Sequence, residues 1–93
     1  MTNEYNFQNQ TIFKKIKLLS NPARFKVLEL TQGNGIPISE IGKKLGIKYK
    51  RCSEYIRKME KEGLLYKTVE GRIKIVKSNA ELRMNAIIFD KKN

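Results

Sequence analysis

Two runs of apolar residues with helical spacing follow one another in the middle of the chain. In the first run, Ile38, Ile41 and Leu45 fall on one helical face, and Ser39 is a suitable N-cap. Gly46 comes next, where a helix ends readily because glycine tolerates a positive φ. The pattern predicts a short helix from Ser39 to Leu45, followed by a tight turn.

In the second run, Cys52, Ile56 and Met59 recur at i, i+4 and i+7, which predicts a buried stripe on a longer helix. Two helices joined by a glycine turn are typical of a helix-turn-helix, which places its second helix in the DNA major groove. A pair of helices with a solvated charged face is the alternative. The face opposite the stripe is basic and polar, and carries Lys50, Ser53, Glu54, Arg57 and Lys61.

Two further helices are predicted upstream. Ile12, Ile16 and Leu19 share one face of an amphipathic helix of about three turns. A second helix starts at Asn21 and Pro22, because asparagine is a good N-cap and proline suits the first helical position. The eight residues before the first helix show no periodicity, and we expect them to form a flexible arm.

A β-hairpin is predicted after the basic helix. Residues 64–69 and 72–77 are rich in strand formers, and Glu70-Gly71 separates them as a tight turn. Residues 36–38 contain a proline and are expected to be extended, as a short edge strand. A basic hairpin directly after a basic helix fits a wing that lies along DNA phosphates. Its basic residues are Lys67, Arg72, Lys74 and Lys77.

A last helix is expected at the C-terminal end. Ser78 and Glu81 have the spacing of a capping box, and the residues up to Phe89 are apolar around most of a helical circumference. One small domain cannot cover such a helix, so we interpret it and the first helix as a homodimer interface. Packing onto the domain's own core is the alternative. The expected interface residues are Ile12, Phe13, Ile16, Leu82, Ala86, Ile87 and Phe89.

Charge indicates the class of partner. The 93 residues include 20 Lys and Arg against 9 Asp and Glu, a net charge of +11. Residues 43–77 hold 12 of the basic residues and four of the acidic ones. Such an excess favours a polyanionic partner, nucleic acid first and an acidic membrane surface second.

Other classes of function are disfavoured. No apolar run approaches the ~18 residues that span a bilayer, and no signal peptide is recognisable, so we expect a cytoplasmic, nucleoid-associated protein. One cysteine and no histidine leave little material for a disulfide, a metal site or a nucleophile with its base. We therefore expect no enzyme activity and no cofactor. Cys52 is interpreted as inert core, with a redox switch as the alternative.

The predicted order of helix, helix, short strand, helix, helix, two-stranded wing and helix is that of a winged helix-turn-helix. The fold class is therefore mainly α with a small β-hairpin wing (α+β), with residues 9–93 as a single domain. Over roughly residues 18–81 the sequence resembles the arsenic-repressor (ArsR) type of archaeal and bacterial winged-helix regulators. The matching positions are Leu19, Pro22, Arg24, Val27 and Leu28, then Ile38 to Ile47, then Ile56, Met59, Glu60, Gly63, Leu64 and Leu65.

The resemblance implies a homodimeric double-stranded-DNA-binding protein, most simply a transcriptional repressor at a palindromic site. Metal sensing does not carry over, because that family's sensors use clusters of cysteine and histidine that this chain lacks. Alternatives are a DNA-organising or plasmid-partition protein that spreads along DNA, and a protein–protein adaptor. The sequence identifies no further protein partner. The expected DNA contacts are Lys43, Lys48, Tyr49, Lys50, Arg51, Ser53, Glu54, Arg57, Lys67, Arg72 and Lys74.

Overall fold

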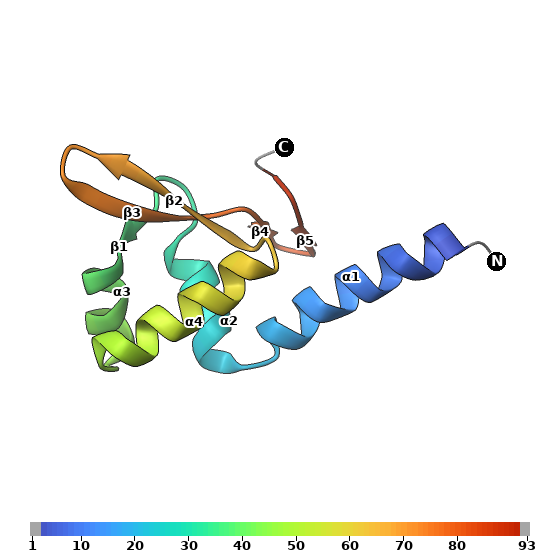
Figure 1. The fold of residues 1–93 in the computed structure, drawn as a ribbon, viewed down its shortest axis with the longest axis horizontal. Coiled ribbons are helices and arrows are strands. Elements are labelled where there is room, and N and C mark those ends of the chain that lie inside the picture. The colour runs from blue at the N-terminus through green and yellow to red at the C-terminus, as the bar shows by residue number, and fades with distance from the viewer. Residues whose placement is uncertain (1–2, 92–93) are drawn as a thin grey trace.

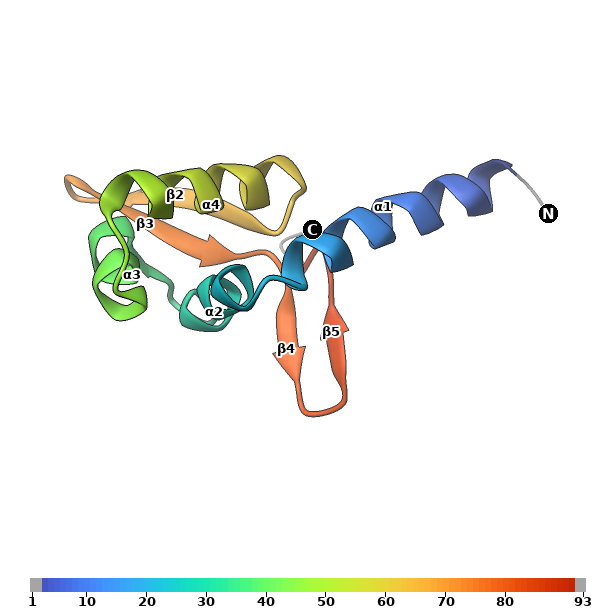
Figure 2. The same cartoon turned by 90° about the horizontal axis from the view of Figure 1, so that it is seen from below.

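The computed structural model describes residues 3–91, and it confirms the winged helix-turn-helix (Figure 1). Three helices, α2 to α4, pack together under a three-stranded antiparallel sheet in the order β1-β3-β2. A second sheet, β4-β5, lies near the middle of the molecule, beside the C-terminal part of α1 (Figure 2). The elements are α1 (Asn3–Leu19), α2 (Pro22–Leu30), β1 (Ile36–Pro37), α3 (Ile38–Leu45), α4 (Tyr49–Lys61), β2 (Leu65–Glu70), β3 (Ile73–Ser78), β4 (Glu81–Arg83) and β5 (Ala86–Ile88).

The hydrophobic core lies between the three central helices and the sheet. The predicted stripe on α4 is confirmed, since Cys52, Ile56 and Met59 have no exposed surface. Leu28 of α2 and Ile41 of α3 are equally buried and belong to the same cluster. Complete burial of an aliphatic side chain contributes roughly 1.5–3 kcal/mol. These side chains therefore hold the helices of the domain together.

The predicted start of α2 and end of α3 are confirmed. The Asn21 side-chain oxygen accepts hydrogen bonds from the backbone N–H groups of Ala23 and Arg24 at 2.9 and 3.2 Å. Gly46 ends α3 in the left-handed region, with φ at 69°. The start of α3 was predicted one residue too late. Pro37 is its N-cap, and Ser39 lies inside the first turn and makes no cap.

The wing has the predicted topology. Strands β2 and β3 pair antiparallel from Leu65 opposite Ser78 to Glu70 opposite Ile73. The short edge strand is confirmed as β1, which pairs with β3. Gly35, just before β1, has φ at 74°, and a Cβ there would come within 2.3 Å of the backbone oxygen of Val76. Glycine is therefore required where the chain passes this close to β3.

The predicted C-terminal helix is wrong. The chain forms a β-hairpin instead, in which Glu81 pairs with Ile88 and Arg83 with Ala86 across a turn at Met84 and Asn85. Two ion pairs hold its base: the Glu81 carboxylate accepts a hydrogen bond from Nε of Arg83 and forms an ion pair with the ammonium of Lys91, both at 2.9 Å. These two cations lower the pKa of Glu81 to about 2.

Long-range hydrogen bonds explain why Ser78 does not cap a helix. Its hydroxyl donates to the Ala80 carbonyl at 2.7 Å and accepts from the Gln32 amide at 2.8 Å. The Gln32 side chain also lies 2.9 Å from the Ala80 carbonyl and accepts from the Leu82 N–H at 3.0 Å. Gln32 therefore anchors the start of the second hairpin to the end of α2.

The first helix is longer than predicted, and it includes most of the segment that was expected to form a flexible arm. Within the described residues α1 already begins at Asn3, so residues 3–8 are helical; Met1 and Thr2 lie outside the described part. The N-terminal half of α1 extends away from the rest of the molecule (Figure 2). No element within the described part packs along it there. With α1 included, the molecule is 47 Å long and 25 Å wide.

An ion pair between a buried lysine and a half-exposed aspartate ties α1 to the C-terminal segment. The Lys15 side chain is 7% exposed, and its ammonium lies 2.9 Å from a carboxylate oxygen of Asp90. The same ammonium lies 5.4 Å from the centre of the Phe89 ring, a cation–π contact. Lys15 lies outside the apolar stripe of Ile12, Ile16 and Leu19, and the contacts with Asp90 and Phe89 cover it instead.

Asp90→Asn keeps the shape of the side chain but leaves the buried Lys15 ammonium without its countercharge. We expect the free energy of unfolding to fall by about 1–2 kcal/mol, measured by urea denaturation. Glu29→Gln is the matched control, because Glu29 pairs with Lys26 at 3.9 Å on an exposed face. In that control the free energy of unfolding should fall by less than about 0.5 kcal/mol. Equal losses in the two variants would contradict the role of the Lys15–Asp90 pair.

Candidate nucleic-acid interface

The outward face of α4 carries the expected base-reading residues. Burial of the Cys52 stripe fixes the rotation of the helix, so the opposite side chains point to solvent. Tyr49 is 63% exposed, and Ser53 is half-buried at the edge of the face. The other DNA contacts expected on this helix are all exposed: Lys50, Arg51, Glu54 and Arg57.

The first turn of α4 is open to an anion. Its N-cap is Lys48, whose side chain makes no capping hydrogen bond, so the first backbone N–H groups have no side-chain acceptor there. Exposed N–H groups and the positive end of the helix dipole attract phosphate. Lys43, in the last turn of α3, and Lys48 itself are exposed beside this end.

A shallow groove of about 540 Å³ opens at the turn between α3 and α4. Lys48, Lys50 and Arg51 line it together with one acidic residue, Glu54. No ion pair within the described part of the chain engages Glu54 or these cations. The groove therefore combines free donors with one free acceptor, which is the combination that reads base edges.

The wing is basic, but its cations differ in availability. Lys67 forms an ion pair with Glu60 of α4 at 3.2 Å, so it ties β2 to the recognition helix and is not free for phosphate in this structure. Arg72 and Lys74 are exposed near the tip, and neither has an ion-pair partner among the described side chains. Of the three predicted wing contacts, these two are the ones available to DNA.

The wing tip also exposes two apolar side chains that the sequence analysis did not single out. Val69 is 66% exposed and Ile73 54%. Alternation along a strand assigns one face to the core, but the tip extends past the core and leaves both faces in solvent. Exposed apolar side chains beside basic ones can contact sugar and base edges in a minor groove.

Other chemistry finds little support in the described residues. Cys52 is fully buried, and burial raises the pKa of its thiol, which agrees with an inert core residue. Within residues 3–91 no cluster of three or more Cys, Asp or Glu side chains could hold a metal ion. Among the same residues, no helix is long and apolar enough to cross a membrane.

A basic helix held outward by a helix-turn-helix, with a basic two-stranded wing beside it, defines a DNA-binding module. The family model of winged helix-turn-helix DNA-binding domains matches residues 20–66, about half of the chain. The chain belongs to this family, and double-stranded DNA is its partner. A search of curated proteins gives no significant match.

Solved structures of the same fold are similar over most of the chain. One is a solution NMR structure of the homodimeric winged helix-turn-helix DNA-binding domain of a Mycobacterium bovis protein, a possible ArsR-family transcriptional regulator. It has a TM-score of 0.75 and 17% identity, over 84% of this chain and 72% of that one. The other is the crystal structure of NolR from Sinorhizobium fredii. It has a TM-score of 0.74 and 14% identity, over 87% of this chain and 81% of that one.

Arg57→Ala tests whether this exposed side chain reads a base. With a site selected from random-sequence DNA, we expect the variant to lose discrimination at one base pair, by ~1–3 kcal/mol, because a bidentate contact to guanine is removed. Fluorescence anisotropy with single-base variants of the site measures it, and Lys44→Ala, exposed on α3, is the control. Equal weakening on selected and random DNA would make Arg57 a phosphate contact.

Proposed function

We propose that the protein is a homodimeric transcriptional repressor that binds an inverted-repeat site on the nucleoid. The observation that carries the proposal is the outward face of α4, which is basic and exposed, together with a wing whose Arg72 and Lys74 are exposed and have no ion-pair partner among the described side chains. Side chains of α4 would contact base edges in the major groove, and the wing would contact the backbone and the neighbouring minor groove.

An exposed apolar stripe on α1 supports the dimer. Ile12 is 44% exposed, Phe13 62% and Ile16 51%. Three large apolar side chains on one solvent-facing helix are costly in a monomer and are typical of a subunit interface. The Mycobacterium bovis domain of similar fold is described as homodimeric.

The second hairpin changes the predicted interface. Leu82 and Phe89, expected at the interface, are partly buried and pack against the protein's own core. Ala86 and Ile87 are exposed as expected. Ile88 and Met84 join them at 38% and 97% exposure. We therefore assign the dimer contact mainly to α1, with the outer side of the second hairpin beside it.

A two-fold axis through this interface would place two recognition helices on one face of DNA. Dimeric proteins of the helix-turn-helix type bind half-sites about one helical turn apart, roughly 34 Å. The site would then be an inverted repeat, because the two copies of α4 are related by the same two-fold axis. The dimer would bind an isolated half-site weakly, because on a full site the binding of one subunit holds the other at a high effective concentration near the second half-site.

Footprinting on a site selected from random-sequence DNA tests the repressor proposal. A dimer that binds one inverted repeat should protect a bounded region of about 20–25 base pairs, two half-sites with their flanks. The boundary should not move as the protein concentration rises. Protection that grows along the DNA with concentration would instead support a DNA-organising or partition protein that spreads.

Phe13→Glu tests the interface, because it places a charge in the apolar contact. We expect monomers by analytical ultracentrifugation and a large loss of affinity for the full site. Val69→Glu is the matched control, since Val69 is as exposed as Phe13 but lies at the wing tip. It should stay dimeric. A stable monomer of the unmodified protein at micromolar concentration that still binds the full site tightly would overturn the dimer.

A further inference from the structure

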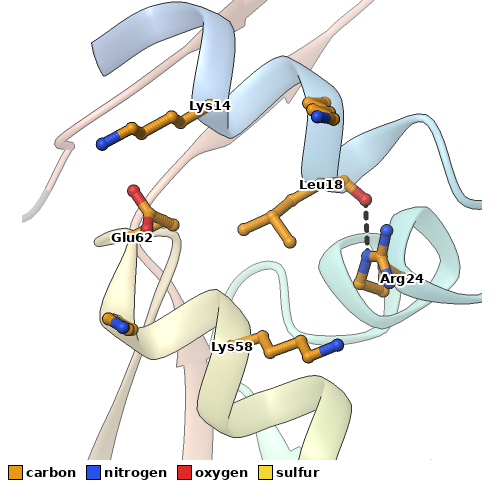
Figure 3. A pocket seen from close by; sticks show the side chains of 7 residues that line it. Lys14, Leu18, Arg24, Lys58 and Glu62 are labelled. Carbon is orange, nitrogen blue, oxygen red and sulfur yellow. Dashed lines mark hydrogen bonds between the residues drawn. The ribbon is translucent and has the colours of Figure 1, made fainter. Parts of the chain in front are cut away.

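A basic hollow of about 340 Å³ lies where α1, α2 and the C-terminal end of α4 meet (Figure 3). Leu18 forms an apolar part of its wall, and Glu62 lies on one side. In this view Lys14 projects from α1 on the side of Glu62, and Lys58 runs from α4 toward Arg24. Its other basic residues are Lys17 and Lys61.

The hollow concentrates positive charge without compensation. Five cations and one carboxylate line it. None of the five forms an ion pair with a side chain that the structure describes. Cations in the last turn of a helix interact favourably with the helix dipole, which accounts for Lys58 and Lys61 of α4 and for Lys17 of α1. The dipole does not account for Lys14 and Arg24, which reach the same place from α1 and α2.

Arg24 is held in position before any ligand binds. Its Nε donates a hydrogen bond to the backbone oxygen of Leu18 at 2.7 Å. The guanidinium carbon also lies 5.9 Å from the centre of the Tyr55 ring. These two contacts leave the terminal nitrogens of the guanidinium without a hydrogen-bond partner among the described residues, in the fork geometry that matches a phosphate group.

We propose that this hollow binds a small polyphosphate anion, such as a nucleoside triphosphate. Arg24 would hold one phosphate by two hydrogen bonds, and the four lysines would neutralise the remaining charge. Leu18 offers an apolar surface to part of the nucleoside, and Glu62 an acceptor for a hydroxyl or amino group. The volume lies at the lower end of the roughly 300–1,000 Å³ of ligand pockets, which suits the phosphates and part of the nucleoside.

The hollow is separate from the DNA-reading surface. The 13 residues of α4 span about 18 Å, and the hollow lies at the end opposite Tyr49. A recognition helix contacts bases mainly through its N-terminal part, so its C-terminal end lies outside the groove. The wing tip also lies at the other end of the molecule from α1 (Figure 1). A concave site between helices suits a compact anion better than a DNA backbone.

Isothermal titration of the full chain without DNA tests the proposal, at one fixed ionic strength. ATP and inorganic tripolyphosphate should each bind once per chain, and AMP much more weakly, because most of the affinity comes from the phosphates. Lys14→Gln with Lys58→Gln should weaken ATP binding by about tenfold or more. Lys26→Gln with Lys44→Gln removes the same charge from exposed positions outside the hollow and should leave the affinity unchanged.

Several outcomes would overturn the proposal. No binding of either polyphosphate would do so, and so would equal loss in the two double variants, which would show only general charge attraction. If Lys48→Gln with Lys50→Gln removed binding while the hollow variant kept it, the anion would bind at the DNA-reading end. A hollow variant that weakens DNA binding but leaves ATP binding intact would make these lysines backbone contacts. Lys17→Gln with Lys61→Gln replaces the first pair if circular dichroism shows that it does not fold.

Discussion

The division of α4 into a buried and a charged face is the constraint on which the rest of the structure depends. Cys52, Ile56 and Met59 lose all contact with solvent, so the helix has only one rotation in which they are covered. That rotation turns Lys50 and Arg57 outward. The wing follows directly from the end of α4, and the Glu60–Lys67 ion pair links the two. Reading surface and core are thus two sides of one packing arrangement.

The parts that could be predicted depend on local physics. Helix periodicity identified the α4 stripe. Asn21 caps α2 through backbone N–H groups within three residues of itself, and Gly46 ends α3 in a conformation that other residues adopt at a cost. The turn at Gly71 separates two strands that pair in register. Each of these signals lies within a few residues of the structure it determines, so a single sequence is enough to recognise it.

The predictions are wrong where contacts with residues far away in the sequence determine the local structure. Ser78 and Glu81 have the spacing of a capping box, but hydrogen bonds from Gln32, 46 residues upstream of Ser78, hold this segment extended. Lys15 reads as a solvated lysine until Asp90, 75 residues later, pairs with it. The cations of the basic hollow come from three helices and form no motif along the chain. Only the packed fold brings such residues together.

The corrected C-terminus also changes how a dimer would be organised. As a helix, residues 81–89 would have offered one continuous apolar surface to a partner. As a hairpin they turn Leu82 and Phe89 toward the protein's own core and leave Ile87 and Ile88 at the surface. Among the described residues, Ile12, Phe13 and Ile16 then form an exposed apolar stripe on α1, whose N-terminal half extends from the domain. The angle at which two α1 helices cross would therefore set the separation of the two recognition helices on DNA.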